Sequence, residues 1–228
     1  MAKKVFIGVG HGGKDPGASK YLVEKDVNLT MALACHEYLV KNGVDVLLSR
    51  KKDEDDPLSD EIKECNAYNP DVAVDIHNNA GGGDGFEAYY YTGGGTSKTL
   101  AKNIEQEVIA IGQNSRGCKT KKNAEGKDYY GFIRQIKAPS VVIEGLFVDN
   151  ATDVKIADTV AEQKEFGYAY ARGILKTLGI TPKEVQAAQL SDTLYKVQVG
   201  AFKNKENAIS LKMQLLKAGF TGAFIKVE

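Results

Sequence analysis

Short apolar runs alternate with longer segments of helical periodicity along residues 1–180. Val5–Val9, Val72–Ile76 and Val141–Ile143 are almost entirely apolar, without the in-and-out alternation of a half-exposed strand. Such runs are typical of strands that lie in the middle of a sheet with helices on both faces. The pattern therefore predicts an α/β fold with a largely parallel, twisted sheet flanked by helices.

Periodicity and turn residues place the individual elements. We expect five main strands and a short sixth one, over Val5–Val9, Val44–Ser49, Val72–His77, Phe86–Tyr91, Val141–Phe147 and Tyr129–Ile133. We expect helices over Tyr21–Asn42 with Ser19 as cap, Leu58–Tyr68 and Ser97–Ile111, and one or two within Asp153–Leu178. The polar, lysine-rich segment Asn114–Asp128 is predicted to be a surface loop near the functional site.

The end of the chain has a different organisation. Residues 181–192 lack strong periodicity and are predicted to be a linker between a main domain, 1–180, and a small unit, 193–228. Within that unit a strand over Tyr195–Phe202, a helix over Lys205–Lys217 and a strand over Phe220–Val227 form one βαβ unit. So small a unit buries little surface, and its open edge offers a template for pairing. A homodimer through this unit is one arrangement that would cover the edge.

Composition excludes several classes of protein. Thirty basic residues balance thirty acidic ones, so the cationic face of a general nucleic-acid binder is not expected. Three widely spaced cysteines without a CxxC motif suggest free thiols in a reducing compartment. No segment has the roughly 20 apolar residues of a membrane span. The apolar run within Met1–Gly8 is too short for a signal peptide, so synthesis in the bacterial cytoplasm without an export signal is expected.

Three polar residues follow predicted strands at the same end. His11 lies two residues after the first strand, His77 ends a later one, and Glu144 ends the apolar run Val141–Ile143 of the last. Ligands and catalytic groups of open α/β sheets collect at the carboxyl edge of the strands. Two imidazoles and one carboxylate would leave a coordination position of Zn²⁺ open for water, and a second carboxylate could act as base.

Glu24 is the fourth candidate, because it shares the apolar stripe of its predicted helix with Val27 and Met31. A buried glutamate is costly unless it is paired or bound to a cation. The alternative is a charge at the edge of the stripe, stabilised by the helix N-terminus. Asp15 and Asp26 are rival carboxylates.

Each of the other candidates also has a plainer interpretation. His11 would be a structural or solvated histidine. His77 would form a buried pair with Asp75 and bind no metal. Asp75 lies on the same face of the strand, and in a metal site it would instead orient the imidazole of His77. Glu144 would simply emerge into solvent, whereas burial would raise its pKa and suit it to proton transfer. His36 lies about 18 Å along the helix from Glu24 and is expected to be a surface or packing residue.

Four blocks of sequence together resemble the zinc-dependent N-acetylmuramoyl-L-alanine amidases of the Amidase_3 type. They are Val9–Ala18, Glu24, Asp75–Ala80 and Val142–Asn150, in the order and spacing of that family. The resemblance implies that His11, Glu24 and His77 bind one Zn²⁺ and that Glu144 is the catalytic glutamate. It also implies a phosphorylase/hydrolase-like arrangement of the sheet, and hydrolysis of the amide between N-acetylmuramic acid and L-alanine in bacterial peptidoglycan. The chain departs from the family's commonest residues at Asp75, Asn78 and Gly145.

The end of the chain has a resemblance of its own. Leu194–Phe202, Lys205–Ala208 and Gly219–Phe220 are similar to the first half of a SPOR domain, a family that binds peptidoglycan glycan strands. This implies a cell-wall-binding role for 193–228. We expect substrate contacts at Asn79, Arg134 and Gln198, although a solvated arginine is the plainer alternative for Arg134.

The biological setting is open at this stage. A phage endolysin that acts on the cell wall after release or lysis is expected, and a sporulation autolysin of the same chemistry is the alternative. A non-catalytic peptidoglycan-binding protein and a different zinc hydrolase, such as a deacetylase or carboxypeptidase, are further alternatives.

Overall fold

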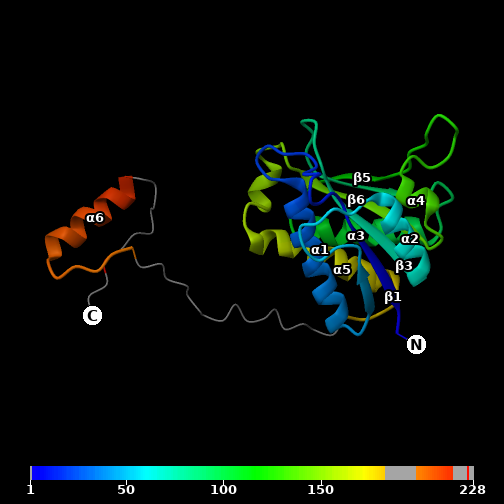
Figure 1. Ribbon diagram of the computed structural model, residues 1–228, viewed down its shortest axis with the longest axis horizontal. Coiled ribbons are helices and arrows are strands. Elements are labelled where there is room, and N and C mark those ends of the chain that lie inside the picture. The colour runs from blue at the N-terminus through cyan, green and yellow to red at the C-terminus, as the bar shows by residue number, and fades with distance from the viewer. Residues whose placement is uncertain (1, 183–198, 218–224, 226–228) are drawn as a thin grey trace. The chain divides into compact units, whose positions relative to one another are not determined.

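The computed structural model describes residues 2–182, 199–217 and 225. The chain divides into two compact units, Met1–Lys183 and Glu184–Glu228 (Figure 1). The first unit contains the sheet and every candidate metal ligand. Among the described residues no helix is long and apolar enough to cross a membrane.

A six-stranded sheet forms the centre of the first unit, with strand order β2-β1-β3-β6-β4-β5. The only antiparallel pair among these strands is β4 with β6, so the predicted largely parallel sheet is confirmed. The strands are β1 Lys4–Val9, β2 Asp45–Leu48, β3 Val72–Asn79, β4 Phe86–Tyr90, β5 Ser115–Lys119 and β6 Ser140–Phe147.

Helices cover both faces of the sheet, as the apolar runs predict. Alternate strand residues, such as Val74 and Val141, pack into the larger core with the helices α1 Glu24–Lys41, α3 Thr96–Ala110 and α5 Val160–Thr177. The intervening residues, such as Ala73 and Val142, pack into a smaller core with α2 Leu58–Tyr68 and α4 Gly131–Gln135. His77 and Glu144 follow the same alternation and face the side of the smaller core.

Three local predictions were wrong. The first helix begins at Glu24 rather than Tyr21, and its N-cap is Val23, without a side-chain cap from Ser19. The predicted strand Tyr129–Ile133 is replaced by the short helix α4. The predicted loop Asn114–Asp128 contains β5, which pairs in parallel with β4 through backbone hydrogen bonds that need no apolar side chains.

The segment after the sheet contains two helices, the 3₁₀ helix η1 Asp153–Ile156 and α5, as expected. In the second unit the predicted helix is confirmed as α6 Lys205–Lys217. The two strands predicted around it fall largely outside the described residues.

Candidate active site

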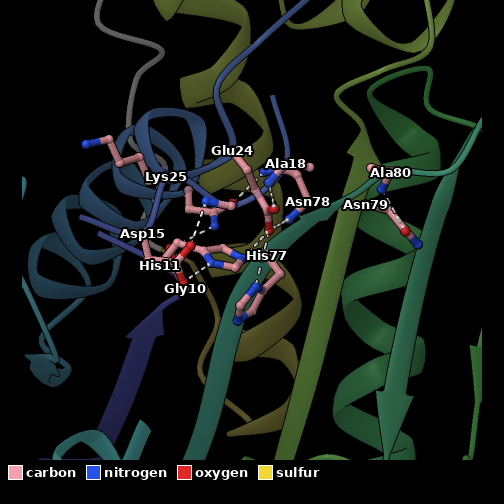
Figure 2. A network of polar contacts seen from close by, with 12 residues as sticks. Gly10, His11, Asp15, Ala18, Glu24, Lys25, His77, Asn78, Asn79 and Ala80 are labelled. Carbon is pink, nitrogen blue, oxygen red and sulfur yellow. Dashed lines mark hydrogen bonds and ion pairs between the residues drawn. The ribbon is translucent and has the colours of Figure 1, made fainter. Parts of the chain in front are cut away.

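His11, Glu24 and His77 converge beyond the carboxyl ends of β1 and β3 (Figure 2). His11 follows β1, Glu24 is the first residue of α1, and His77 lies near the end of β3. Glu24 Oε1 lies 3.1 Å from His11 Nε2 and 3.3 Å from His77 Nδ1. The ligand atoms of the three residues lie within 4.8 Å of one another, which is the arrangement of a metal-binding cluster.

The electrostatics of the cluster follow from this convergence. Burial alone would raise the pKa of Glu24, which is 4% exposed, but hydrogen bonds from His11 and His77 hold that pKa well below its usual value. The hydrogen bond to Glu24 raises the pKa of His11. Burial would lower the pKa of His77, but the neighbouring Asp75 and Glu24 outweigh it and raise that pKa. The carboxylate thus stays ionised, as a metal ligand must.

A second carboxylate lies behind each imidazole. Asp15 Oδ2 lies 2.8 Å from His11 Nδ1, and Asp75 Oδ2 lies 3.4 Å from His77 Nε2. In each ring, therefore, one nitrogen faces Glu24 and the other faces an outer acid. Carboxylates in this position orient metal-bound histidines and fix their tautomer. The chemistry of the donor set therefore fits Zn²⁺, which favours imidazole and carboxylate ligands.

Two glycines make room for the ligands. A Cβ atom on Gly10 would lie 2.2 Å from Cε1 of His77, and one on Gly17 would lie 2.6 Å from Oε2 of Glu24. His11 itself has a left-handed backbone with φ of 64°. The glycine-rich loop is thus needed for close approach as well as for its turns.

Arg50 fixes the loop to the helix that carries Glu24. Its guanidinium is buried and donates hydrogen bonds to the carbonyl oxygens of Val9 (3.0 Å), Gly10 (3.2 Å) and Lys25 (2.8 Å). It thereby connects the residues next to His11 and Glu24. Sequence reasoning missed this role, and the only signal was an arginine directly after a predicted strand.

Glu144 faces the same site from the neighbouring strand, where its register partner is His77. Burial raises the pKa of Glu144 to about 7, while the nearby His77 opposes part of that rise. A carboxyl with such a pKa can exchange a proton near neutral pH. The predicted partly desolvated glutamate is therefore found.

A cavity of about 760 Å³ lies beside the two histidines of the cluster and Glu144. His11, His77 and Glu144 line it together with Asp75, Glu61 and Tyr130. Glu61, on α2, was not predicted, and burial next to Asp75 and Asp56 raises its pKa well above the usual value. The volume is that of a site for a small molecule or a short peptide segment.

Asn79 and Arg134, two of the predicted substrate-binding residues, lie apart from this cluster. Asn79 accepts a hydrogen bond from the backbone of Ala80 and lies to one side of the three ligands (Figure 2). Arg134 donates to the carbonyl oxygens of Asp128 and Tyr129. Neither residue is among those that line the cavity. Gln198 lies outside the described residues.

Comparison with known proteins agrees with the site. The family model for N-acetylmuramoyl-L-alanine amidase matches residues 5–176, and the model for the SPOR domain matches 191–228. The amidase CwlM of Bacillus licheniformis is 34% identical, over 97% of this chain and 84% of the relative. The sporulation-specific N-acetylmuramoyl-L-alanine amidase of Bacillus subtilis is 35% identical, over 95% and 82%.

Two further similarities extend the comparison. An endolysin of Bacillus phage SPP1 is 31% identical, over 80% of this chain and 69% of the relative. The solved catalytic domain of CwlV, an amidase from Bacillus (Paenibacillus) polymyxa, superposes with a TM-score of 0.70 at 29% identity, over 78% of this chain and 99% of that domain. The family match covers most of the chain and includes all four candidate residues, so this chain belongs to the N-acetylmuramoyl-L-alanine amidase family.

Proposed function

We propose that this chain binds one Zn²⁺ through His11, Glu24 and His77 and hydrolyses the amide between N-acetylmuramic acid and L-alanine in peptidoglycan. The observation that carries the proposal is the convergence of these three residues, from separate elements, beside the partly buried Glu144. The family to which the chain belongs supplies the bond and the substrate.

The chain's own residues account for the proton transfers. Zn²⁺ supplies Lewis acidity when bound, which polarises an amide carbonyl and makes a nearby water more acidic. Glu144 accepts a proton from the attacking water as the new C–O bond forms. It then donates that proton to the alanine nitrogen as the C–N bond breaks, so the products are a lactyl carboxylic acid, which loses its proton to solvent, and a free amine.

The remaining candidates have supporting roles in this proposal. Asp15 orients the imidazole of His11, and Asp75 orients that of His77, so that the other nitrogen of each ring faces Glu24. Asn79 and Arg134 stay predictions as substrate contacts. Because the guanidinium of Arg134 already binds two carbonyl oxygens, a substrate contact there would use its remaining N–H groups.

Mass spectrometry of muropeptides released from purified peptidoglycan tests the reaction. We expect peptides with a free N-terminal L-alanine, and no such product after chelator treatment. Loss of acetate would identify a deacetylase, and loss of a C-terminal residue a carboxypeptidase. Stoichiometric zinc with no product would support a non-catalytic wall-binding protein instead.

For 193–228 we propose binding to glycan strands, supported by the SPOR match. Sedimentation with peptidoglycan stripped of its peptides, comparing the full chain with residues 1–183, tests this role. The two should differ in the bound fraction if the second unit binds glycan. Gln198 as a glycan contact and the homodimer through this unit stay predictions, and analytical ultracentrifugation of the full chain tests the latter.

We further propose that the enzyme acts at the cell wall, as an endolysin that reaches the wall after the membrane is opened. Expression with and without an inducible membrane pore tests this setting, because an endolysin lyses the host only when the pore is open. A sporulation autolysin is the second candidate. Its support is that the alignment with the sporulation-specific amidase extends over 95% of the chain, against 80% for the phage endolysin.

A further inference from the structure

Two buried asparagines form a chain of hydrogen bonds behind the site. Asn28 Nδ2 donates to the carbonyl oxygen of Gly10 at 2.9 Å, and Asn78 Nδ2 donates to Asn28 Oδ1 at 2.7 Å. Asn78 Oδ1 in turn accepts from the backbone N–H of Leu146 at 3.1 Å. Asn28 is 0% exposed and Asn78 is 2% exposed, so these bonds are shielded from water.

The residues that these hydrogen bonds connect lie close in sequence to the proposed metal ligands and the proposed base. Gly10 directly precedes His11, and Asn78 directly follows His77. Asn28 lies one helical turn after Glu24 on α1. Leu146 lies two residues after Glu144 on β6. The asparagine pair therefore joins the four separate segments on which the metal ligands and the proposed base are located.

Asn78 also contacts one of the ligands directly. Its backbone N–H donates to Glu24 Oε1 at 3.2 Å, the same oxygen that both imidazoles approach (Figure 2). A displacement of Asn78 would thus move both the β3 backbone next to His77 and a hydrogen bond on the carboxylate.

The surroundings leave space for this amide. A Cβ atom on Gly145 would lie 2.9 Å from Asn78 Oδ1 and 2.2 Å from the hydroxyl of Tyr170. Any larger residue at 145 would therefore displace the Asn78 amide or Tyr170. Asn78 and Gly145 are therefore coupled by packing, since the amide of Asn78 needs the space that a side chain at 145 would take.

We propose that the Asn28–Asn78 amide pair is a positioning device that sets the spacing of His11, Glu24, His77 and Glu144. The inference rests on the proposed function, since it concerns the ligands and base of that reaction. Buried amides with satisfied partners fix a single arrangement of the elements that they join. Small misplacements of a metal ligand or a base lower metal affinity and turnover more than they lower stability.

Asn78→Ala, Asn28→Ala and the double variant test the proposal in the full chain. Asn66→Ala is the matched control, because Asn66 likewise donates to a carbonyl oxygen, of Gln135 (3.0 Å), and accepts from a backbone N–H, of Lys137 (2.9 Å), away from the site. The readouts are the zinc dissociation constant from chelator competition, the visible spectrum of the Co²⁺-substituted protein, kcat and KM, and the Tm of the metal-free protein.

We expect each single variant to bind zinc about 10-fold or more weakly, the range for groups that orient metal ligands. The Co²⁺ bands should shift and kcat should fall with little change in KM. The double variant should lose less zinc affinity than the two single losses combined, since both single variants remove the shared bond between Asn28 and Asn78. Asn66→Ala should lower the Tm without changing the zinc dissociation constant or the spectrum.

Two results would overturn the inference. One is a folded Asn78→Ala or Asn28→Ala protein with zinc affinity and Co²⁺ spectrum equal to wild type. The other is a fully additive double variant. Should one variant fail to fold, the other perturbs the same bond from the opposite side. Failure of the proposed function is distinct, since the wild-type protein itself would then bind no zinc or release no L-alanine amine.

Discussion

Glu144 stands directly opposite His77 in the parallel ladder between β3 and β6, and both side chains face the smaller core. The proposed base and a proposed metal ligand thus share one row of the sheet. Neighbouring strands lie about 4.8 Å apart, so the backbone of the proposed base lies next to that of a proposed metal ligand, and both side chains line the same cavity. This relationship underlies the first two predictions.

Glu144→Gln is expected to lower kcat by about 10²- to 10⁴-fold, the usual contribution of a general acid–base. The amide keeps the size of the carboxyl but cannot accept the proton. Muropeptide release at saturating substrate measures the effect, and zinc content together with Tm provides the control. Full activity in this variant would remove Glu144 from the mechanism.

The pH profile should show an acid limb that belongs to Glu144. Burial raises the pKa of this carboxyl to about 7, and only its ionised form can accept a proton, so kcat/KM should rise with pH through the pKa. A bound dication favours the ionised form, so we expect the limb between about 4.5, the ordinary glutamate value, and about 7. A flat profile across that interval would contradict the assignment. The residual activity of Glu144→Gln should lack the limb.

Removal of any one metal ligand should abolish stoichiometric zinc binding. Each of the variants His11→Ala, Glu24→Ala and His77→Ala lacks one of the three metal ligands. We expect at least a 100-fold loss of activity, because loss of a residue that only orients a ligand already costs up to about 100-fold. Elemental analysis of the purified proteins measures the metal. His36→Ala is the matched control on α1 and should retain one zinc per chain. Zinc bound equally to all four variants would place the metal elsewhere.

Asp75→Asn should weaken zinc binding about 10- to 100-fold without abolishing it. Asp75 Oδ2 lies 3.4 Å from His77 Nε2 and contacts the metal ligand only through that nitrogen. The uncharged amide still fills the space but orients the imidazole less strongly. Chelator competition gives the affinity, and an unchanged dissociation constant would show that Asp75 does not support His77.

Gly10→Ala should disrupt the site far more than the fold. The added Cβ would lie 2.2 Å from Cε1 of His77, so the imidazole must move. Gly43→Ala is the control, since φ of +80° at Gly43 strains any other residue but no atom lies within 4 Å of the new Cβ. It should cost about 1 kcal/mol of stability with normal zinc affinity. Equal zinc affinity in the two variants would argue against the predicted collision.

The local sequence pattern predicted most of the helices and strands, and each wrong prediction has a physical reason. Residues Ser115–Lys119 are polar and contain a glycine, yet they form the edge strand β5, because edge pairing depends on backbone groups and on the partner strand. Tyr129–Ile133 was predicted to be a strand because short apolar runs do not distinguish strand from helix. In the helical conformation of α4, Phe132 and Ile133 pack into the smaller core, and this tertiary contact favours the helix over a strand.

The place where the polar side chains would gather followed from the order of strands along the chain. Parallel strands carry their carboxyl ends to one edge, so His11, His77 and Glu144 had to be near one another once the strands were identified. Contacts between distant segments could be known only from the folded structure. They are the approach of Glu24 to both imidazoles, the hydrogen bonds of Arg50 to the end of β1 and to α1, and the hydrogen bond between Asn28 and Asn78. Side-chain periodicity specifies which face a residue occupies, but not which residue of another segment will meet it there.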